Sequence, residues 1–131
     1  QVLDGGVLMV DGTHTPSGNY PAHARAQVID LETAADRLVA KLPGTRRQTE
    51  NLAREAGSSV LMMAMEAGDQ VQEHSAPGVV SIHVMRGHAT VTAEGEAFSL
   101  RPGQLALLQP GVRHDVRAES QSVLVLVVSG G

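Results

Sequence analysis

The stretch "QEHSAPGVVSIHVMRGHATV", residues 72–91, holds three of the six histidines in this chain of 131 residues. Val and Ile dominate its apolar positions, and Pro77-Gly78 and Gly87 interrupt it. β-Branched residues favour strands, whereas Pro and Gly favour turns. The stretch therefore predicts short strands joined by tight turns, with His74 at the end of one strand.

The same pattern continues from residue 58 to residue 128. Apolar runs alternate with turn signals at intervals of about ten residues. Eight short strands are predicted, at residues 58–66, 69–74, 79–85, 89–94, 96–100, 104–109, 112–118 and 122–128. Such a series is typical of an all-β antiparallel sandwich or barrel.

One helix is predicted before these strands, in "DLETAADRLVAKLPG", residues 30–44. Asp30 is a suitable N-cap, and Pro43-Gly44 ends the segment. Its apolar residues recur at helical spacing and form one face: Leu31, Ala34, Ala35, Leu38, Val39 and Leu42. Residues 45–57 suit either a helix or an edge strand, and residues 1–27 are expected to form an arm.

The length predicts one structural domain, in which residues 1–57, the arm and the helix, pack on a β-barrel of residues 58–131. Several strands are apolar on both faces, such as "VLMMAM" and "VLVLVV". One face can fill the barrel, and the helix, the arm or a second copy must cover the other. We therefore expect a homodimer.

Composition argues against several classes of protein. The net charge is −4 and no basic stripe is present, so nucleic-acid binding is not expected. The absence of cysteine excludes thiol nucleophiles and zinc–thiolate sites. The longest apolar run, residues 123–128, is too short to span a bilayer, and the first residues do not look like a signal peptide. We expect no membrane association and a cytoplasmic location.

Two spaced motifs resemble those of the cupin superfamily, which carries Gly, five residues, His-x-His, three or four residues, Glu, six residues and Gly. Here Gly68, His74 and Gly87 fit that spacing. The second cupin motif is Gly, five residues, Pro-x-Gly, two residues, His, three residues and Asn, which Gly103, residues 109–111 and His114 resemble. The resemblance covers about residues 58–128 and implies a jelly-roll β-barrel.

The chain departs from the family pattern at several positions. Ala76 stands where the second histidine belongs, Val80 where the glutamate belongs, Gln109 where the first proline belongs and Ala118 where the asparagine belongs. Of the four ligands that a complete cupin offers to a divalent transition metal (Zn, Mn, Fe, Ni or Cu), His74 and His114 remain. The two histidines could equally form a hydrogen-bonded pair without metal.

His83 is the nearest replacement ligand, so His74, His114 and His83 form the predicted metal set, with Glu73 or water as other ways to complete it. Strand alternation places Val80, Ile82 and Val84 on one face and His83 on the other, so His83 faces away if Val80, the lost glutamate position, faces inward. A β-bulge near Pro77-Gly78 could reverse which face points inward. We expect Ile82 and Val84, with the histidine pair, to contact the ligand. Glu94 and Glu96 flank Gly95 and are expected to be solvated hairpin residues.

Three functions remain open from sequence. The resemblance implies a module, such as a sensor, that binds a small organic molecule in the barrel, with His74 and His114 fixing its polar end. The missing ligands favour this module, and the alternative is a metal-dependent dioxygenase, isomerase or lyase that uses these two histidines. A third function is metal-free acid–base catalysis, because imidazole titrates near neutral pH. Whether the protein is an enzyme is left open.

Overall fold

The computed structural model describes residues 7–9, 14–15, 26–55 and 57–130. It confirms all eight strands predicted between residues 58 and 128, and it resolves residues 45–57 in favour of a strand. The described residues contain one helix, α1 (Leu31–Ala40). The strands are β1 (Val7–Met9), β2 (His14–Thr15), β3 (Gln27–Ile29), β4 (Arg47–Glu55), β5 (Ser58–Met65), β6 (Gln70–His74), β7 (Val79–Arg86), β8 (Ala89–Ala93), β9 (Glu96–Leu100), β10 (Leu105–Leu108), β11 (His114–Ala118) and β12 (Ser122–Ser129).

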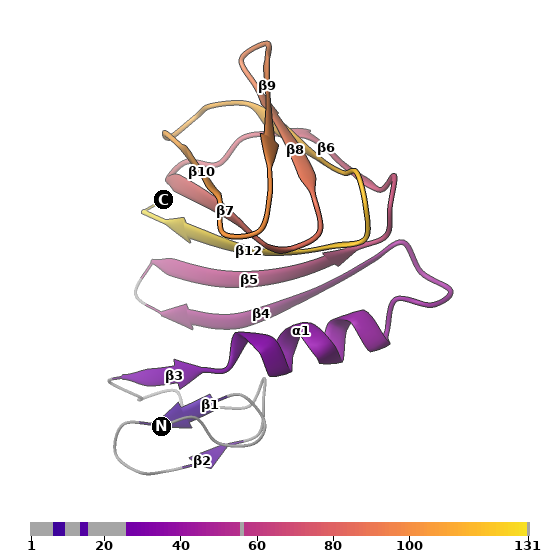
Figure 1. The fold of residues 1–131 in the computed structure, drawn as a ribbon. Coiled ribbons are helices and arrows are strands. Elements are labelled where there is room, and N and C mark those ends of the chain that lie inside the picture. The colour runs from indigo at the N-terminus through magenta and orange to yellow at the C-terminus, as the bar shows by residue number, and fades with distance from the viewer. Residues whose placement is uncertain (1–6, 10–13, 16–25, 56, 131) are drawn as a thin grey trace.

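Two antiparallel sheets make up the body of the molecule. The larger has the order β10-β7-β12-β5-β4, and the smaller has the order β6-β11-β8-β9. Figure 1 shows α1, the larger sheet and the smaller sheet as successive layers. The jelly-roll prediction is supported, but a single closed barrel is not what the pairing gives. Among the described strands, β9 and β10 end their sheets without pairing to each other.

Side-chain alternation divides the larger sheet into two apolar faces. Ile82, Val84 and Leu124 point toward the smaller sheet, while Val123 and Val125 pack on the helix side. This sheet therefore has a buried layer on each face, as its doubly apolar strands require. The core between the sheets consists of Met65, Val80, Ile82, Val84, Ala89, Val91, Ala93, Leu100, Leu108, Val116, Ala118 and Leu124.

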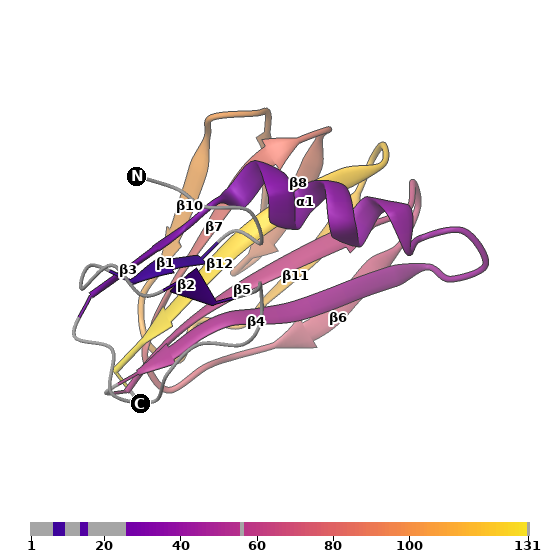
Figure 2. The same ribbon diagram turned by 90° about the horizontal axis from the view of Figure 1, so that it is seen from below.

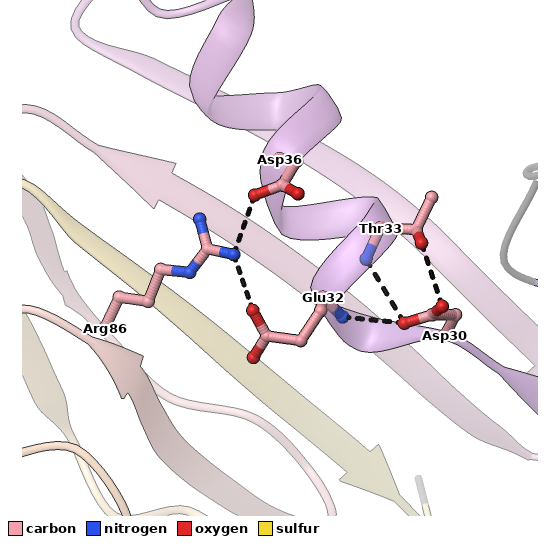
Figure 3. A network of polar contacts seen from close by, with 5 residues as sticks. All are labelled: Asp30, Glu32, Thr33, Asp36 and Arg86. Atoms are coloured by element: carbon pink, nitrogen blue, oxygen red, sulfur yellow. Dashed lines mark hydrogen bonds and ion pairs between the residues drawn. The ribbon is translucent and has the colours of Figure 1, made fainter.

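Helix α1 begins at the predicted cap. The Asp30 carboxylate accepts hydrogen bonds from the backbone N–H groups of Glu32 and Thr33, at 3.1 and 3.2 Å (Figure 3). The helix lies across the outer face of the larger sheet (Figure 2) and buries Ala34, Ala35 and Leu38 there. Thus the helix supplies part of the cover that the sequence required. No helix within the described ranges has the length and apolar character needed to cross a membrane.

A β-bulge in β7 turns the side chain of Arg86 toward helix α1. The pairing of β7 with β12 shifts between Val123 and Leu124, which leaves Met85 as an extra residue. Met85 packs on the helix side, and Arg86 reaches helix α1 on that side as well. One Arg86 nitrogen donates to Glu32 at 2.6 Å and to Asp36 at 2.8 Å (Figure 3). Hydrogen bonding to Glu32, then to Asp36, raises the pKa of Arg86.

The turn after β7 requires the motif glycine at position 87. Gly87 has φ +82°, a left-handed conformation that other residues adopt at a cost. A Cβ atom there would lie 2.2 Å from the backbone oxygen of Gln121. Only glycine lets β7 turn into β8 this close to the β11–β12 connection.

Candidate functional site: an imidazole pair and its cleft

His74 and His114 come together although 40 residues separate them in the chain. His74 ends β6, His114 begins β11, and the two are direct partners in the strand register. Their ring centroids are 4.3 Å apart, with the planes inclined at 58°. His114 is buried and His74 is exposed, so the pair runs from the core to the surface.

Each ring is oriented by a hydrogen bond of the same kind, from Nδ1 to the backbone oxygen two residues earlier. Nδ1 of His74 lies 2.9 Å from the backbone oxygen of Gln72, and Nδ1 of His114 lies 3.0 Å from that of Val112. A carbonyl oxygen can only accept, so each Nδ1 carries the proton and donates. In the neutral rings, each Nε2 then keeps its lone pair for a ligand.

Backbone contacts hold the two motif segments against each other. The N–H of Gly111 donates to the carbonyl oxygen of Ala76 at 2.9 Å, which ties the turn before β11 to the segment after β6. Arg113 donates to Glu73 at 3.0 Å on the exposed surface. Glu73, a predicted alternative ligand, therefore pairs with Arg113 beside the histidines.

A cleft adjoins the imidazole pair on the inner face of the smaller sheet. The register aligns His74, His114, Ala93 and Glu96 in one row across β6, β11, β8 and β9. Partners in such a row share a face. The cleft has a volume of about 250 Å³ and is lined by Ala93, Glu94, Glu96, Phe98, Leu107, Leu108, Gln109 and Val112.

Two independent links connect this cleft to His114. Ala93, which lines the cleft, is the register partner of His114 in β8. Val112, which also lines it, provides the carbonyl oxygen that holds the His114 ring. Neither histidine is among the residues that line the cleft, but these two links place the imidazole pair directly beside it.

Glu94 and Glu96 are the site residues that sequence reasoning missed. The hairpin prediction was right, because Ala93 pairs with Glu96 across a two-residue turn. Both residues are exposed, as predicted, and both also line the cleft. Alternation of β9 offered a signal, since Glu96 shares a face with Phe98 and the buried Leu100.

The third predicted metal ligand is not brought to the pair. His83 is the register partner of Leu105 in β10 and of Val125 in β12, and Val125 packs on the helix side. The bulge that would have reversed this face lies after His83, at Met85, and not near Pro77-Gly78. His83 therefore occupies the face of the larger sheet opposite to the core.

The predicted ligand contacts Ile82 and Val84 face inward, as alternation required, but both are fully buried in the packed core. Neither is among the residues that line the cleft. A ligand in the cleft would therefore rest against Ala93, Phe98 and Val112, outside the core that Ile82 and Val84 help to fill.

The donor set fits the family's four-ligand metal only in part. Two of the four matching positions carry imidazoles, while Ala76 and Val80 carry apolar side chains packed in or against the core. Within the described residues, no group of three or more His, Asp or Glu side chains is placed to hold a metal ion. The pair supplies two nitrogen donors, too few for a complete protein-derived shell.

Comparisons with known proteins support the fold. The family model described as Cupin domain matches residues 61–130. No curated protein matches the chain. Among solved structures, a conserved protein of unknown function from Streptococcus pyogenes is 21% identical over 66% of this chain and 75% of its own, with a TM-score of 0.63.

Two similar structures carry more specific names. KdgF from Halomonas sp. is 21% identical over 63% of this chain and 79% of its own, with a TM-score of 0.59. The DMSP lyase DddQ from Ruegeria pomeroyi is 20% identical over 66% of this chain and 48% of its own, with a TM-score of 0.60. At these identities the likeness supports the shared fold.

Proposed function

The chain belongs to the cupin family, and from this premise we propose that it is a binding module for a small organic molecule. The molecule lies in the cleft at the end of the sandwich, and its polar end is fixed by His74 and His114. The observation that carries this proposal is the pair of rings 4.3 Å apart, each held through Nδ1 by a backbone carbonyl.

Anchored rings suit recognition because their acceptors are already in place. A ligand hydroxyl, amine or amide can donate to one or both Nε2 atoms without first ordering the side chains. The adjoining cleft combines apolar side chains with a few polar ones, which is the usual make-up of a small-molecule site. The volume of about 250 Å³ suits a molecule smaller than a typical drug.

A fragment screen on the whole chain tests the proposal. A mixed set of small alcohols, amines, acids and amides is added singly, and the imidazole proton resonances are followed by NMR. We expect hits that shift the His74 and His114 signals together. These hits should bind at least several-fold more weakly to His74→Ala and His114→Ala, because each loses one acceptor.

His83→Ala is the matched control, since it removes the same group from the opposite face of the larger sheet. It should bind every hit as the unmodified protein does. The proposal fails if no fragment moves the paired signals, or if both alanine variants fold and still bind like the parent.

A metal-dependent enzyme is the second candidate, favoured by the two Nε2 lone pairs. His74 and His114 would hold the ion, and a bound metal would supply Lewis-acid chemistry. The ligand or water would have to provide the remaining donors, because Ala76 and Val80 provide none. Elemental analysis of freshly purified protein tests this: about one metal per chain, lost in His74→Ala but kept in His83→Ala, would favour the enzyme over the metal-free module.

A further inference from the structure

We infer that the cleft selects a small molecule with a positively charged amine on a compact apolar body. This inference rests on the proposed binding function and adds the class of ligand. The cleft carries two carboxylates, Glu94 and Glu96, and none of its described lining residues is positively charged. An ammonium group complements this charge, whereas a carboxylate ligand would be repelled.

The two carboxylates are available for a ligand. Within the described part of the chain, neither Glu94 nor Glu96 takes part in an ion pair, although seven other ion pairs form there. Glu73, by contrast, pairs with Arg113 beside the same cleft. The negative charge at the cleft is therefore left without a neutralising partner from the described residues.

The apolar part of the cleft matches a hydrocarbon body. Phe98 is one of the chain's two aromatic residues, and it stays 44% exposed where it lines the cleft. Its register partner is the fully buried Val91, so the ring lies on the inner face of β9, at the open edge of the sandwich. Covering this ring with a ligand would remove apolar surface from water.

The register row that runs from His114 through Ala93 to Glu96 also limits the length of the ligand. Glu96 stands two strands from His114, so their backbones are about 10 Å apart. A compact body of about six to eight heavy atoms is shorter than that gap, so its amine can lie near Glu96 while its other end faces His114. Ala93, which separates them in the row, is the small residue that leaves this space open.

Three probes with the same ring and different head groups test the inference: cyclohexylmethylamine, cyclohexylmethanol and cyclohexanecarboxylate. Each is titrated into the full chain, and amide shifts of the cleft residues locate the binding. The amine should bind most tightly and the carboxylate most weakly. Added salt should weaken the binding of the amine but not that of the alcohol, because salt screens exposed charges.

Glu96→Gln should weaken the binding of the amine about two- to fivefold, as expected for the loss of one exposed ion pair. The affinity for the alcohol should not change. Glu55→Gln changes the net charge equally at an exposed position on β4 and should leave the amine unaffected. Phe98→Ala should weaken amine and alcohol alike.

The outcomes separate the two proposals. If the alcohol or the carboxylate binds at the cleft as tightly as the amine, or if Glu96→Gln leaves the preference unchanged, the amine inference is wrong while the binding function stands. If none of the three shifts the cleft signals, the amine inference is also wrong. If the wider fragment set fails as well, the binding function is wrong too.

Discussion

Asp69 is a buried carboxylate that ties β4 to the start of β6. Arg47 donates to it twice, at 2.7 and 3.1 Å, and Arg46 lies 3.6 Å away. Its backbone oxygen also accepts from the N–H of Ala118 in β11, so the residue joins both sheets. Hydrogen bonding from Arg47 lowers the pKa of Asp69 below its ordinary value of 3.8, although burial opposes this shift.

We expect Asp69→Asn to lower the free energy of unfolding by about 1–2 kcal/mol at pH 7, because a charged, partly buried pair is lost. A lowered folded-state pKa stabilises the fold at pH values above the unfolded-state pKa. The contribution is lost as the pH falls through the folded-state value. Urea unfolding at several pH values should therefore show a constant deficit above pH 5 that shrinks below about pH 4.

Glu55→Gln, at an exposed site, is the control and should change the free energy of unfolding by less than about 0.5 kcal/mol at every pH. A deficit for Asp69→Asn that persisted undiminished at pH 2.5 would show that packing, and not charge, accounts for the loss.

The meeting of His74 with His114 could be predicted, because two motifs with the right spacing each place one histidine at a strand end. The ring orientation could not. It depends on the carbonyl oxygens of Gln72 and Val112, and backbone acceptors leave no trace in side-chain identity. Alternation of β9 indicated the face of Glu96, but its place in the row beside the histidines could not be predicted, since that depends on pairings across four strands.

At the scale of elements, apolar packing and surface charge contribute unequally to the docking of α1 on the sheet. Leu38 is almost fully buried beneath the helix, whereas the Glu32 and Asp36 carboxylates that bind Arg86 are about 70% exposed. Exposed ion pairs contribute little, while a buried leucine contributes several kilocalories per mole. The buried leucine therefore contributes most to holding the helix on the sheet, and the ion pairs with Arg86 add little.

The two contributions can be compared by mutation. Leu38→Ala should reduce the free energy of unfolding by about 2–4 kcal/mol, and Arg86→Gln by about 0.3–1 kcal/mol. Urea unfolding in 0.5 M NaCl should abolish most of the Arg86→Gln deficit, because salt screens exposed pairs, and leave that of Leu38→Ala. An equal cost for the two variants, or a salt-independent cost for Arg86→Gln, would contradict this account.

Elements whose apolar residues recur at a clear helical or strand spacing could be predicted from sequence, and those without such spacing could not. The helix has apolar residues at helical spacing and a cap at Asp30, so both its existence and its start were predictable. Residues 45–57 are polar at most positions, and β4 forms there because it pairs along nearly all of β5. Such long-range pairing overrides a weak local preference.

At the scale of the whole molecule, the sequence predicted the two-sided burial of the larger sheet but not how the sheets end. Alternation within a strand is local, whereas closure depends on whether terminal strands meet. Here β9 and β10 stay apart, and the cleft forms beside their unpaired edges. The fold is thus a jelly roll of two sheets, and the cleft lies where their edge strands do not pair.

The edge strand β10 also bears on the expected homodimer, which we propose forms through this strand. Leu105, at the end of β10 away from the residues that line the cleft, is more than half exposed on the outer face of the larger sheet, whereas α1 packs over β4 and β5. Exposed apolar edge strands favour pairing with another chain. We expect light scattering to give twice the chain mass of 13.7 kDa at micromolar concentration.

Leu105→Lys should shift that mass toward the monomer, because a lysine on an edge strand opposes pairing. Leu107 is left unchanged, since it lines the cleft. Thr92→Lys, on the outer face of the smaller sheet, adds the same charge away from β10 and should leave the dimer intact. A parent protein that is monomeric throughout, or a Leu105→Lys variant that dimerises as strongly as Thr92→Lys, would exclude this edge as the interface.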